Sequence, residues 1–163
     1  VRFRMLHPTQ GFPYLGNEAS CVIRVETKHG NVLLTGDIGH YVERALLRRE
    51  SARMRNDVVV VAHHGSAGSS DPGFVEATGA RLALVSSGAG NRFGHPRADG
   101  VERWCGAGAE VVDTARAGAV RVWLAGDGLQ LDERRIARPR LWDAARRRHG
   151  TAGLCYVPEM QRP

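Results

Sequence analysis

The stretch Val58-Val59-Val60-Val61-Ala62-His63-His64-Gly65-Ser66 is a β-branched apolar run that ends in two imidazoles. A second apolar run, Val32-Leu33-Leu34-Thr35-Gly36-Asp37, ends in a carboxylate. Each run is typical of a buried strand, because strands covered on both faces are continuously apolar. If the two strands are parallel neighbours, their ends meet at one edge of the sheet, where open α/β sheets bind ligands. The two runs therefore predict a functional site at that edge.

The residue types at these strand ends are those of metal ligands. Asp37 together with His63 or His64 suits Zn²⁺ or Mn²⁺. Because adjacent residues of an extended strand point to opposite faces, we expect one histidine to ligate and the other to contact the substrate or act as a general acid. Which of the two ligates stays open. His7, which ends a short apolar run, is a candidate third ligand, and Asp37 is a candidate bridge between two cations.

Further candidate site residues lie in two loops that follow strands. In Gly90-Asn91-Arg92-Phe93-Gly94-His95-Pro96, Asn91 or His95 is expected to donate hydrogen bonds to a phosphoryl oxygen, as a substrate clamp. Ser66 is grouped with the substrate-binding residues, and His95 joins the two adjacent histidines as a candidate catalytic group. A serine nucleophile is not favoured, because the sequence shows no nucleophile elbow and no third group to orient the base.

Composition indicates a globular domain with an excess of positive charge. The 163 residues suggest one domain, and 42% hydrophobic and 25% charged residues are ordinary for such a domain. The formal net charge is +6, and arginine supplies nearly all the positive charge, which is compatible with a polyanionic partner. No apolar run approaches the roughly 20 residues that cross a bilayer. The chain begins with Val1 and not with methionine, so we expect a fragment or an excised domain.

The three cysteines, Cys21, Cys105 and Cys155, are odd in number and widely spaced. They form no CxxC motif, and their spacing indicates no disulfide framework. We therefore interpret them as small hydrophobic residues that say little about the redox compartment.

Apolar periodicity predicts strands that alternate with helices, which favours an α/β fold. A hairpin with its turn at His29-Gly30-Asn31 joins the second and third expected strands. We divide the chain into a domain at 1–133 and an arginine-rich tail at 134–163, in which Leu141 and Trp142 are interleaved. After a short strand and loop within Val1–Gly16, the expected strands are Cys21–Glu26, Val32–Thr35, Asp57–Ala62, Leu82–Ser86, Glu110–Asp113, Ala119–Leu124 and Leu129–Leu131, and the expected helices are Glu43–Arg53, Pro72–Ala77 and Asp99–Gly106.

Five strings, in order along the chain, resemble the carboxy-terminal metallo-β-lactamase-like domain of ComEC-type DNA-uptake proteins. They are NEASCVIRV, VLLTGDI, VVVVAHHGSAGSS, NRFGHP and TARAGAVRV. The resemblance implies the C-terminal half of a metallo-β-lactamase-type αββα sandwich, whose strand edge holds one or two Zn²⁺ or Mn²⁺ ions. It also implies that His7, Asp37 and the His63–His64 doublet match the superfamily's metal motifs. Asn91 and His95 match a family-specific loop, and the arginine-rich end resembles the tail of proteobacterial members.

The same resemblance implies a role in natural transformation. ComEC-type proteins form the inner-membrane channel for transforming single-stranded DNA, and their metallo-domain is proposed to degrade the strand that does not enter. We therefore expect metal-dependent phosphodiester hydrolysis of the non-transported strand in the intact parent protein. The expected partners are DNA and the parent's membrane channel domain, without a small-molecule cofactor. We expect the domain on the extracytoplasmic side of the inner membrane.

One part of the family pattern is absent from this chain. The superfamily's main ligand cluster, an HxHxDH-like motif, should lie upstream of His7 together with the first half of the sandwich. Metal binding by this chain alone is therefore expected to be weak or absent. Two alternatives stay open: a catalytically silent module that binds single-stranded DNA in a salt-dependent manner, and a metallo-hydrolase of a small ester.

Overall fold

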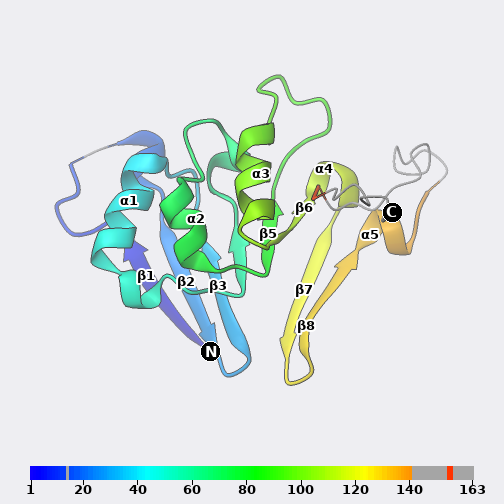
Figure 1. Ribbon diagram of the computed structural model, residues 1–163, viewed down its shortest axis with the longest axis horizontal. Helices are drawn as coiled ribbons and strands as arrows, with labels where there is room; N and C mark the ends of the chain where they lie inside the picture. The colour runs from blue at the N-terminus through cyan, green and yellow to red at the C-terminus, as the bar shows by residue number, and fades with distance from the viewer. Residues whose placement is uncertain (14, 141–153, 156–163) are drawn as a thin grey trace, which may run out of the picture.

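The computed structural model describes residues 1–13, 15–140 and 154–155. Within them, a six-stranded sheet has the order β1-β2-β3-β4-β5-β6, and β7 and β8 form a separate hairpin. Figure 1 shows α1, α2 and α3 over one face of the sheet, so the expected α/β class is confirmed. The strands are β1 (Arg2–His7), β2 (Val22–Thr27), β3 (Gly30–Leu34), β4 (Val58–Val60), β5 (Leu82–Val85), β6 (Glu110–Asp113), β7 (Val120–Ala125) and β8 (Gly128–Glu133). The helices are α1 (His40–Arg49), α2 (Pro72–Thr78), α3 (Ala98–Gly106), α4 (Thr114–Ala117) and α5 (Arg134–Ala137), with 3-10 turns η1 (Gly16–Ala19), η2 (Ser51–Arg53) and η3 (Ala62–Gly65).

The sheet is mixed, and each of its faces packs against a different layer. Strands β1 to β3 are antiparallel, whereas β3 to β6 are parallel, which confirms the parallel pairing of β3 with β4. Because side chains alternate along a strand, each strand contributes to both layers. Leu33 and Val59 lie in the core under the helices. Val58 and Leu82, on the opposite face, lie in a second cluster that packs against β7 and β8.

The hairpin leaves part of its sheet face uncovered. Phe3 pairs with Val25, which pairs with Val32, and this row leads to Val58 in the second cluster. Paired residues share a face, so Phe3 and, two residues on, Met5 lie on the hairpin side of the sheet. Their exposed fractions are 72% and 56%. An apolar sheet face of this kind normally packs against another layer.

Local differences from the expected elements have physical reasons. The hairpin turn lies at Lys28 and His29, because Gly30 already pairs with Thr27. Helix α1 begins at His40, since the extended backbone of Gly39 allows it to cap the helix. The predicted tail begins with α5, whose first residue donates its backbone N–H to the Ala119 carbonyl at 2.9 Å. Beyond Arg140, the predicted tail residues other than Leu154 and Cys155 lie outside the described residues.

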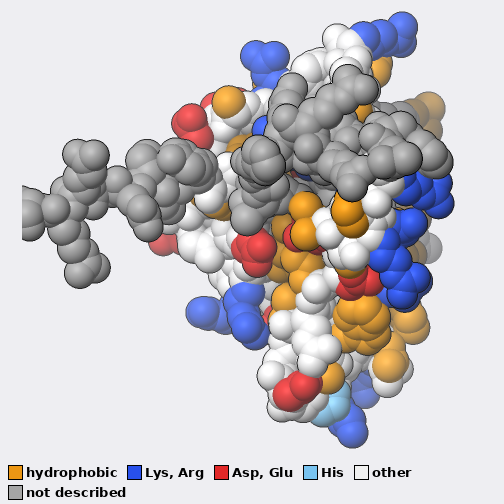
Figure 2. Space-filling model, turned by 90° about the vertical axis from the view of Figure 1, so that its right-hand side faces the viewer, with side chains coloured by type: hydrophobic (Ala, Val, Ile, Leu, Met, Phe, Trp, Pro, Cys, Tyr) orange, Lys and Arg blue, Asp and Glu red, His pale blue; other side chains and the backbone are white. Residues whose placement is uncertain are grey.

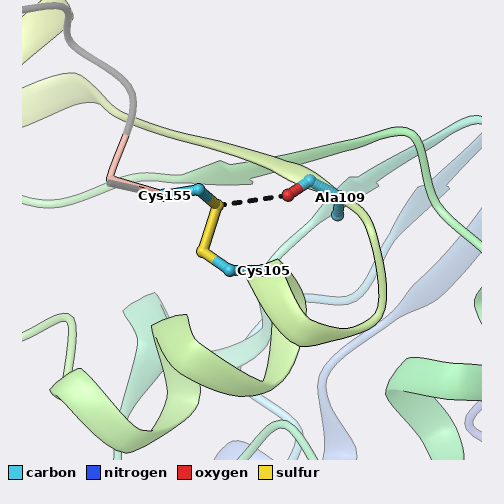
Figure 3. The surroundings of a disulfide bond; sticks show 3 residues. All are labelled: Cys105, Ala109 and Cys155. Carbon is cyan, nitrogen blue, oxygen red and sulfur yellow. Dashed lines mark hydrogen bonds between the residues drawn. A yellow bond between two sulfur atoms is a disulfide. The ribbon is translucent and has the colours of Figure 1, made fainter. Parts of the chain in front are cut away.

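The interpretation of the cysteines as isolated hydrophobic residues was wrong for two of them. Cys105, at the end of α3, forms a disulfide with Cys155, 50 residues further along the chain (Figure 3). The Cys155 Sγ also lies 3.2 Å from the Ala109 carbonyl. Leu154 donates its backbone N–H to the Val111 carbonyl of β6 at 2.8 Å, and its side chain packs on the core. The bond therefore fastens a distant segment of the chain to α3 and β6.

A buried carboxylate holds the loop that follows η3. Glu43 of α1 is fully buried, and its two carboxylate oxygens accept the backbone N–H groups of Ser70 (2.8 Å) and Asp71 (2.7 Å). Ser70 has a left-handed backbone with a φ of 64°. Asp71 then caps α2 by accepting the N–H groups of Gly73 and Phe74. Burial raises the pKa of Glu43 above its ordinary value of 4.5, although both hydrogen bonds oppose the shift.

Replacing Glu43 with Gln is expected to lower the free energy of unfolding by about 1–3 kcal/mol, because the amide nitrogen would face a buried N–H donor. The raised pKa means that the folded state holds the Glu43 proton more tightly than the unfolded state. The stability that protonated Glu43 contributes is therefore present below pH 4.5 and is lost as the pH rises through the raised pKa. Urea unfolding at several pH values measures this, with the exposed Glu76→Gln as control. A stability gap between wild type and E43Q that widens with pH would contradict the assignment.

Candidate functional site

The loops that follow β3 and β4 lie side by side and are locked together. The Thr35 hydroxyl donates to the Val60 carbonyl at 2.6 Å, which joins the ends of the two strands. The backbone N–H of His63 donates to the Gly36 carbonyl at 3.0 Å. These bonds bring the residue after Gly36, which is Asp37, next to the histidine doublet. The expected meeting of the two strand ends at one edge is confirmed.

Asp37 and His64 form the central pair of the site. The His64 Nε2 lies 3.6 Å from the Asp37 Oδ1, and both side chains are partly exposed. The His64 Nδ1 lies 2.7 Å from the Ser86 carbonyl, which can only accept, so Nδ1 carries the hydrogen. In the neutral ring the Nε2 lone pair then faces the carboxylate. Two ligands at 2.0–2.1 Å from a tetrahedral Zn²⁺ are roughly 3.4 Å apart, so this pair fits a shared cation.

His63 has different neighbours from His64. Its Nε2 lies 3.2 Å from the Asn17 Nδ2, and because an amide nitrogen only donates, the ring nitrogen accepts. The ring centroids of His63 and His64 are 6.4 Å apart. His64 is thus the histidine of the doublet that lies beside Asp37, and which of the two ligates a metal stays a prediction.

The prediction that the histidines continue an extended strand was wrong. Strand β4 ends at Val60, and the backbone of His63 (φ 49°) and His64 (φ 56°) is left-handed. Such backbone costs of order 1 kcal/mol or more for a residue with a side chain, and strain of this kind is concentrated at functional sites. Gly65 continues the turn with a φ of 75°, and a Cβ there would lie 2.7 Å from the Pro96 Cβ. The 88–97 loop therefore packs closely against the backbone at this glycine.

Asn91 organises the 88–97 loop from within. Its amide nitrogen donates to the carbonyls of Gly88 (3.0 Å) and His95 (2.7 Å), and its oxygen accepts the His95 N–H at 3.0 Å. These bonds use the amide inside the loop, and the substrate-clamp role of Asn91 stays a prediction.

His95 stands next to His63, with ring centroids 6.1 Å apart. Burial lowers the pKa of His95 below 6.5, and the neighbouring His63, His64 and Arg97 add to the shift. This shift favours the neutral form of the ring. Its Nδ1 is buried and has no hydrogen-bond partner among the described residues.

His7 is buried beside the turn η1, whose Asn17 contacts His63. It is 1% exposed, its Nε2 donates to the Glu18 carbonyl at 2.7 Å, and its ring meets Phe12 edge-on at 4.3 Å. The Nδ1 therefore carries a lone pair, and this buried atom has no hydrogen-bond partner among the described residues. An orphaned ring nitrogen has the chemistry of a metal ligand, and its role as a ligand stays a prediction.

Ser66 was predicted as a site residue, whereas Asn17 was not. Ser66 is buried and its hydroxyl lies 3.4 Å from that of Ser69, so here it supports the loop, and its substrate-binding role stays a prediction. Asn17, in the turn η1, contacts His63 and was missed as a site residue. The only sequence signal was its place in the string NEASCVIRV, where a lone asparagine before a strand resembles an ordinary turn residue.

The donor set is incomplete for a metal site within the described residues. No three His, Cys, Asp or Glu side chains there lie close enough together to hold one metal ion. Protein zinc sites use three or four protein ligands. Asp37 and His64 therefore fit as part of such a site, which further donors would have to complete.

Comparisons with known proteins place this chain beside competence proteins. It is 30% identical over 136 residues to competence protein ComA of Neisseria gonorrhoeae, covering 83% of this chain and 20% of that protein. It is 32% identical over 135 residues to recombination protein 2 of Haemophilus influenzae, covering 83% and 17%. It is 32% identical over 96 residues to ComE operon protein 3 of Bacillus subtilis, covering 59% and 12%. No protein-family model matches the chain.

This chain is thus homologous to one segment of competence proteins and spans a fifth or less of their length. The resemblance to competence proteins is confirmed, whereas the metallo-β-lactamase assignment stays a prediction. None of the helices in the described part of the chain has both the length and the apolar character that a bilayer crossing requires.

Proposed function

We propose that this chain is the second half of a metallo-β-lactamase-type domain that hydrolyses phosphodiester bonds of DNA during uptake. The observation that carries the proposal is the Asp37–His64 pair, in which the His64 Nε2 lies 3.6 Å from the Asp37 Oδ1 at a strand edge. The names of the homologous competence proteins supply the biological setting. The substrate is proposed as the strand of DNA that is not transported.

The uncovered sheet face supports the sandwich architecture. On the hairpin side of the sheet, the hairpin leaves apolar side chains exposed. They are Phe3 and Met5 on β1 and Leu34 on β3. In an αββα sandwich this face would pack against the sheet of the other half. The same missing half would supply the HxHxDH-type ligands that the donor set lacks.

The chain's own residues divide the chemical work. Asp37 and His64 would hold a Zn²⁺ or Mn²⁺ ion, with His7 as a candidate further ligand through its orphaned Nδ1. Such an ion, when bound, activates water and neutralises charge on a phosphoryl oxygen. His63, whose Nε2 accepts from Asn17, presents its Nδ1 hydrogen to the substrate. The lowered pKa of His95 favours orientation of the phosphate over proton donation at neutral pH.

The disulfide supports an extracytoplasmic location. Disulfides persist in oxidising compartments and are rare in the reducing cytosol. The Cys105–Cys155 bond joins segments 50 residues apart and lies against the core. We therefore place the domain on the outer side of the inner membrane, beside the channel domain of a longer parent protein.

A catalytically silent DNA-binding module is the second candidate, favoured by the charge of the chain. The formal net charge is +6, and Figure 2 shows a group of Lys and Arg side chains along one edge of the face that carries the β7–β8 hairpin, with others around its margin. Such a module would bind single strands without metal and with a steep dependence on salt.

Metal-dependent cleavage separates these candidates. The protein is extended upstream of Val1 in its own reading frame and incubated with a labelled single-stranded oligonucleotide. We expect cleavage that EDTA abolishes and that Mn²⁺ or Zn²⁺ restores. A small ester such as a lactone, tested in parallel, should not be turned over. Salt-sensitive binding without cleavage in the presence of either metal would contradict the hydrolase and favour the silent module.

A further inference from the structure

We propose that Phe93, together with Arg92, is a stacking platform for a nucleobase of single-stranded nucleic acid beside the Asp37–His64 site. The Phe93 ring is 62% exposed and belongs to neither hydrophobic core of the described residues. A large aromatic side chain held outside the core contributes little to folding. The proposal rests on the proposed function, because it names the form of DNA that the same site accepts.

The ring environment suits a flat, electron-rich ligand. The Arg92 guanidinium carbon lies 4.9 Å from the centroid of the Phe93 ring, which is a cation–π contact. The His95 ring is nearly parallel to Phe93, with an interplanar angle of 16° and centroids 5.7 Å apart. Aromatic rings and arginine guanidinium planes are the two groups on which proteins stack unpaired bases. Arg92 is long and exposed, so it can cover a base or move to the adjacent phosphate.

Hydrogen bonds hold the loop that carries Phe93 in place relative to the Asp37–His64 site. Asn91 makes three hydrogen bonds within the loop, and the backbone N–H of Arg97 donates to the Gly65 carbonyl at 2.8 Å. The loop is thus tied to the residue that follows the histidine doublet. A site held in place before binding loses less entropy when the ligand is ordered. The Phe93 ring contacts the His95 ring, which in turn contacts the His63 ring. These contacts connect the platform to the histidine doublet.

Charge favours a nucleic acid as the ligand. The 88–97 loop contains Arg92 and Arg97, both exposed, and no acidic residue. Two cations beside an exposed ring match the alternation of phosphate and base along a single strand. A duplex keeps its bases stacked inside, so it could offer the cations its phosphates but could not offer the ring a base. The platform therefore predicts preference for unpaired strands.

Binding of fluorescent oligonucleotides to the 163-residue chain tests the platform without requiring cleavage. The probes are a 12-residue oligothymidylate, an abasic strand of the same length and a 12-base-pair duplex, each followed by anisotropy at fixed low salt. Wild type should prefer the oligothymidylate over the other two. We expect Phe93→Ala to weaken oligothymidylate binding about ten-fold or more and to leave abasic binding unchanged. Phe93→Trp should retain binding, and Trp123→Ala, an exposed aromatic on β7, is the control.

Equal affinity of wild type and Phe93→Ala for the oligothymidylate would overturn the platform, as would equal wild-type affinity for the oligothymidylate and the abasic strand. In either case, metal-dependent cleavage would still support the proposed function. Conversely, base-selective binding that depends on Phe93 would support the platform even if the extended protein did not cleave DNA. The two proposals therefore fail separately.

Discussion

Replacing Cys105 with Ser is expected to lower the melting temperature of this chain by roughly 10 °C. The Cys105–Cys155 bond closes a loop of 50 residues. In the chain-entropy model, a cross-link over such a loop stabilises the folded state by about 4 kcal/mol. For a domain of this size, each 1 kcal/mol shifts the melting temperature by roughly 2–4 °C. The docked Leu154 backbone and side chain would be released as well.

Calorimetry of oxidised and reduced protein measures this effect with an internal control. A reductant should lower the melting temperature of wild type to that of Cys105→Ser and should leave the variant unchanged. Cys21 is exposed and unpaired, so Cys21→Ser should behave like wild type in both conditions. Identical melting temperatures for oxidised wild type and Cys105→Ser would show that the cross-link does not stabilise the fold.

Much of the sheet could be predicted because its strands are short β-branched runs bounded by turn residues. The expected strand Glu110–Asp113 matches β6 residue for residue. The sequence argument assumed that the two motif-bearing strands are parallel neighbours, and the ladder of Val32 with Val58 confirms that assumption. Here local pattern and tertiary structure agree, which is the usual condition for a successful sequence-based prediction.

The disulfide could not be predicted, because the pairing of Cys105 with Cys155 is set by tertiary structure. Nothing in a 50-residue separation distinguishes a bonded pair from two isolated cysteines. The partners meet because Leu154 bonds to the backbone of β6. That bond is a long-range contact without a local sequence signal.

The geometry of the histidine doublet was also beyond local reasoning. A run of four valines favours continued strand, yet the chain turns into left-handed backbone at His63 and His64. Bonds from other segments stabilise the turn: the Gly36 carbonyl accepts from His63, and Asn17 contacts its ring. Tertiary contacts therefore override the local β propensity at the residues that carry the chemistry.

Replacing Asp37 with Asn is expected to reduce DNA cleavage by the upstream-extended protein by roughly 100-fold or more. The amide keeps the shape of the side chain but removes the negative charge that would stabilise a bound cation. The Asp37 carboxylate lies next to the His64 Nε2, so the substitution weakens the cation position that the two side chains would share. Initial rates of cleavage at saturating metal measure the effect. Asp127→Asn, at the turn between β7 and β8, removes an equivalent charge away from this edge and should cleave normally.

A double-mutant comparison tests whether Asp37 and His64 act through one cation. If they do, combining Asp37→Asn with His64→Ala should cost little more than either change alone, because the first substitution already disables the shared position. If the losses multiply instead, the two side chains act independently, and the 3.6 Å approach of Oδ1 to Nε2 has no joint role in catalysis. Full cleavage by Asp37→Asn, still dependent on metal, would assign the metal to other residues and leave this strand edge with a structural function.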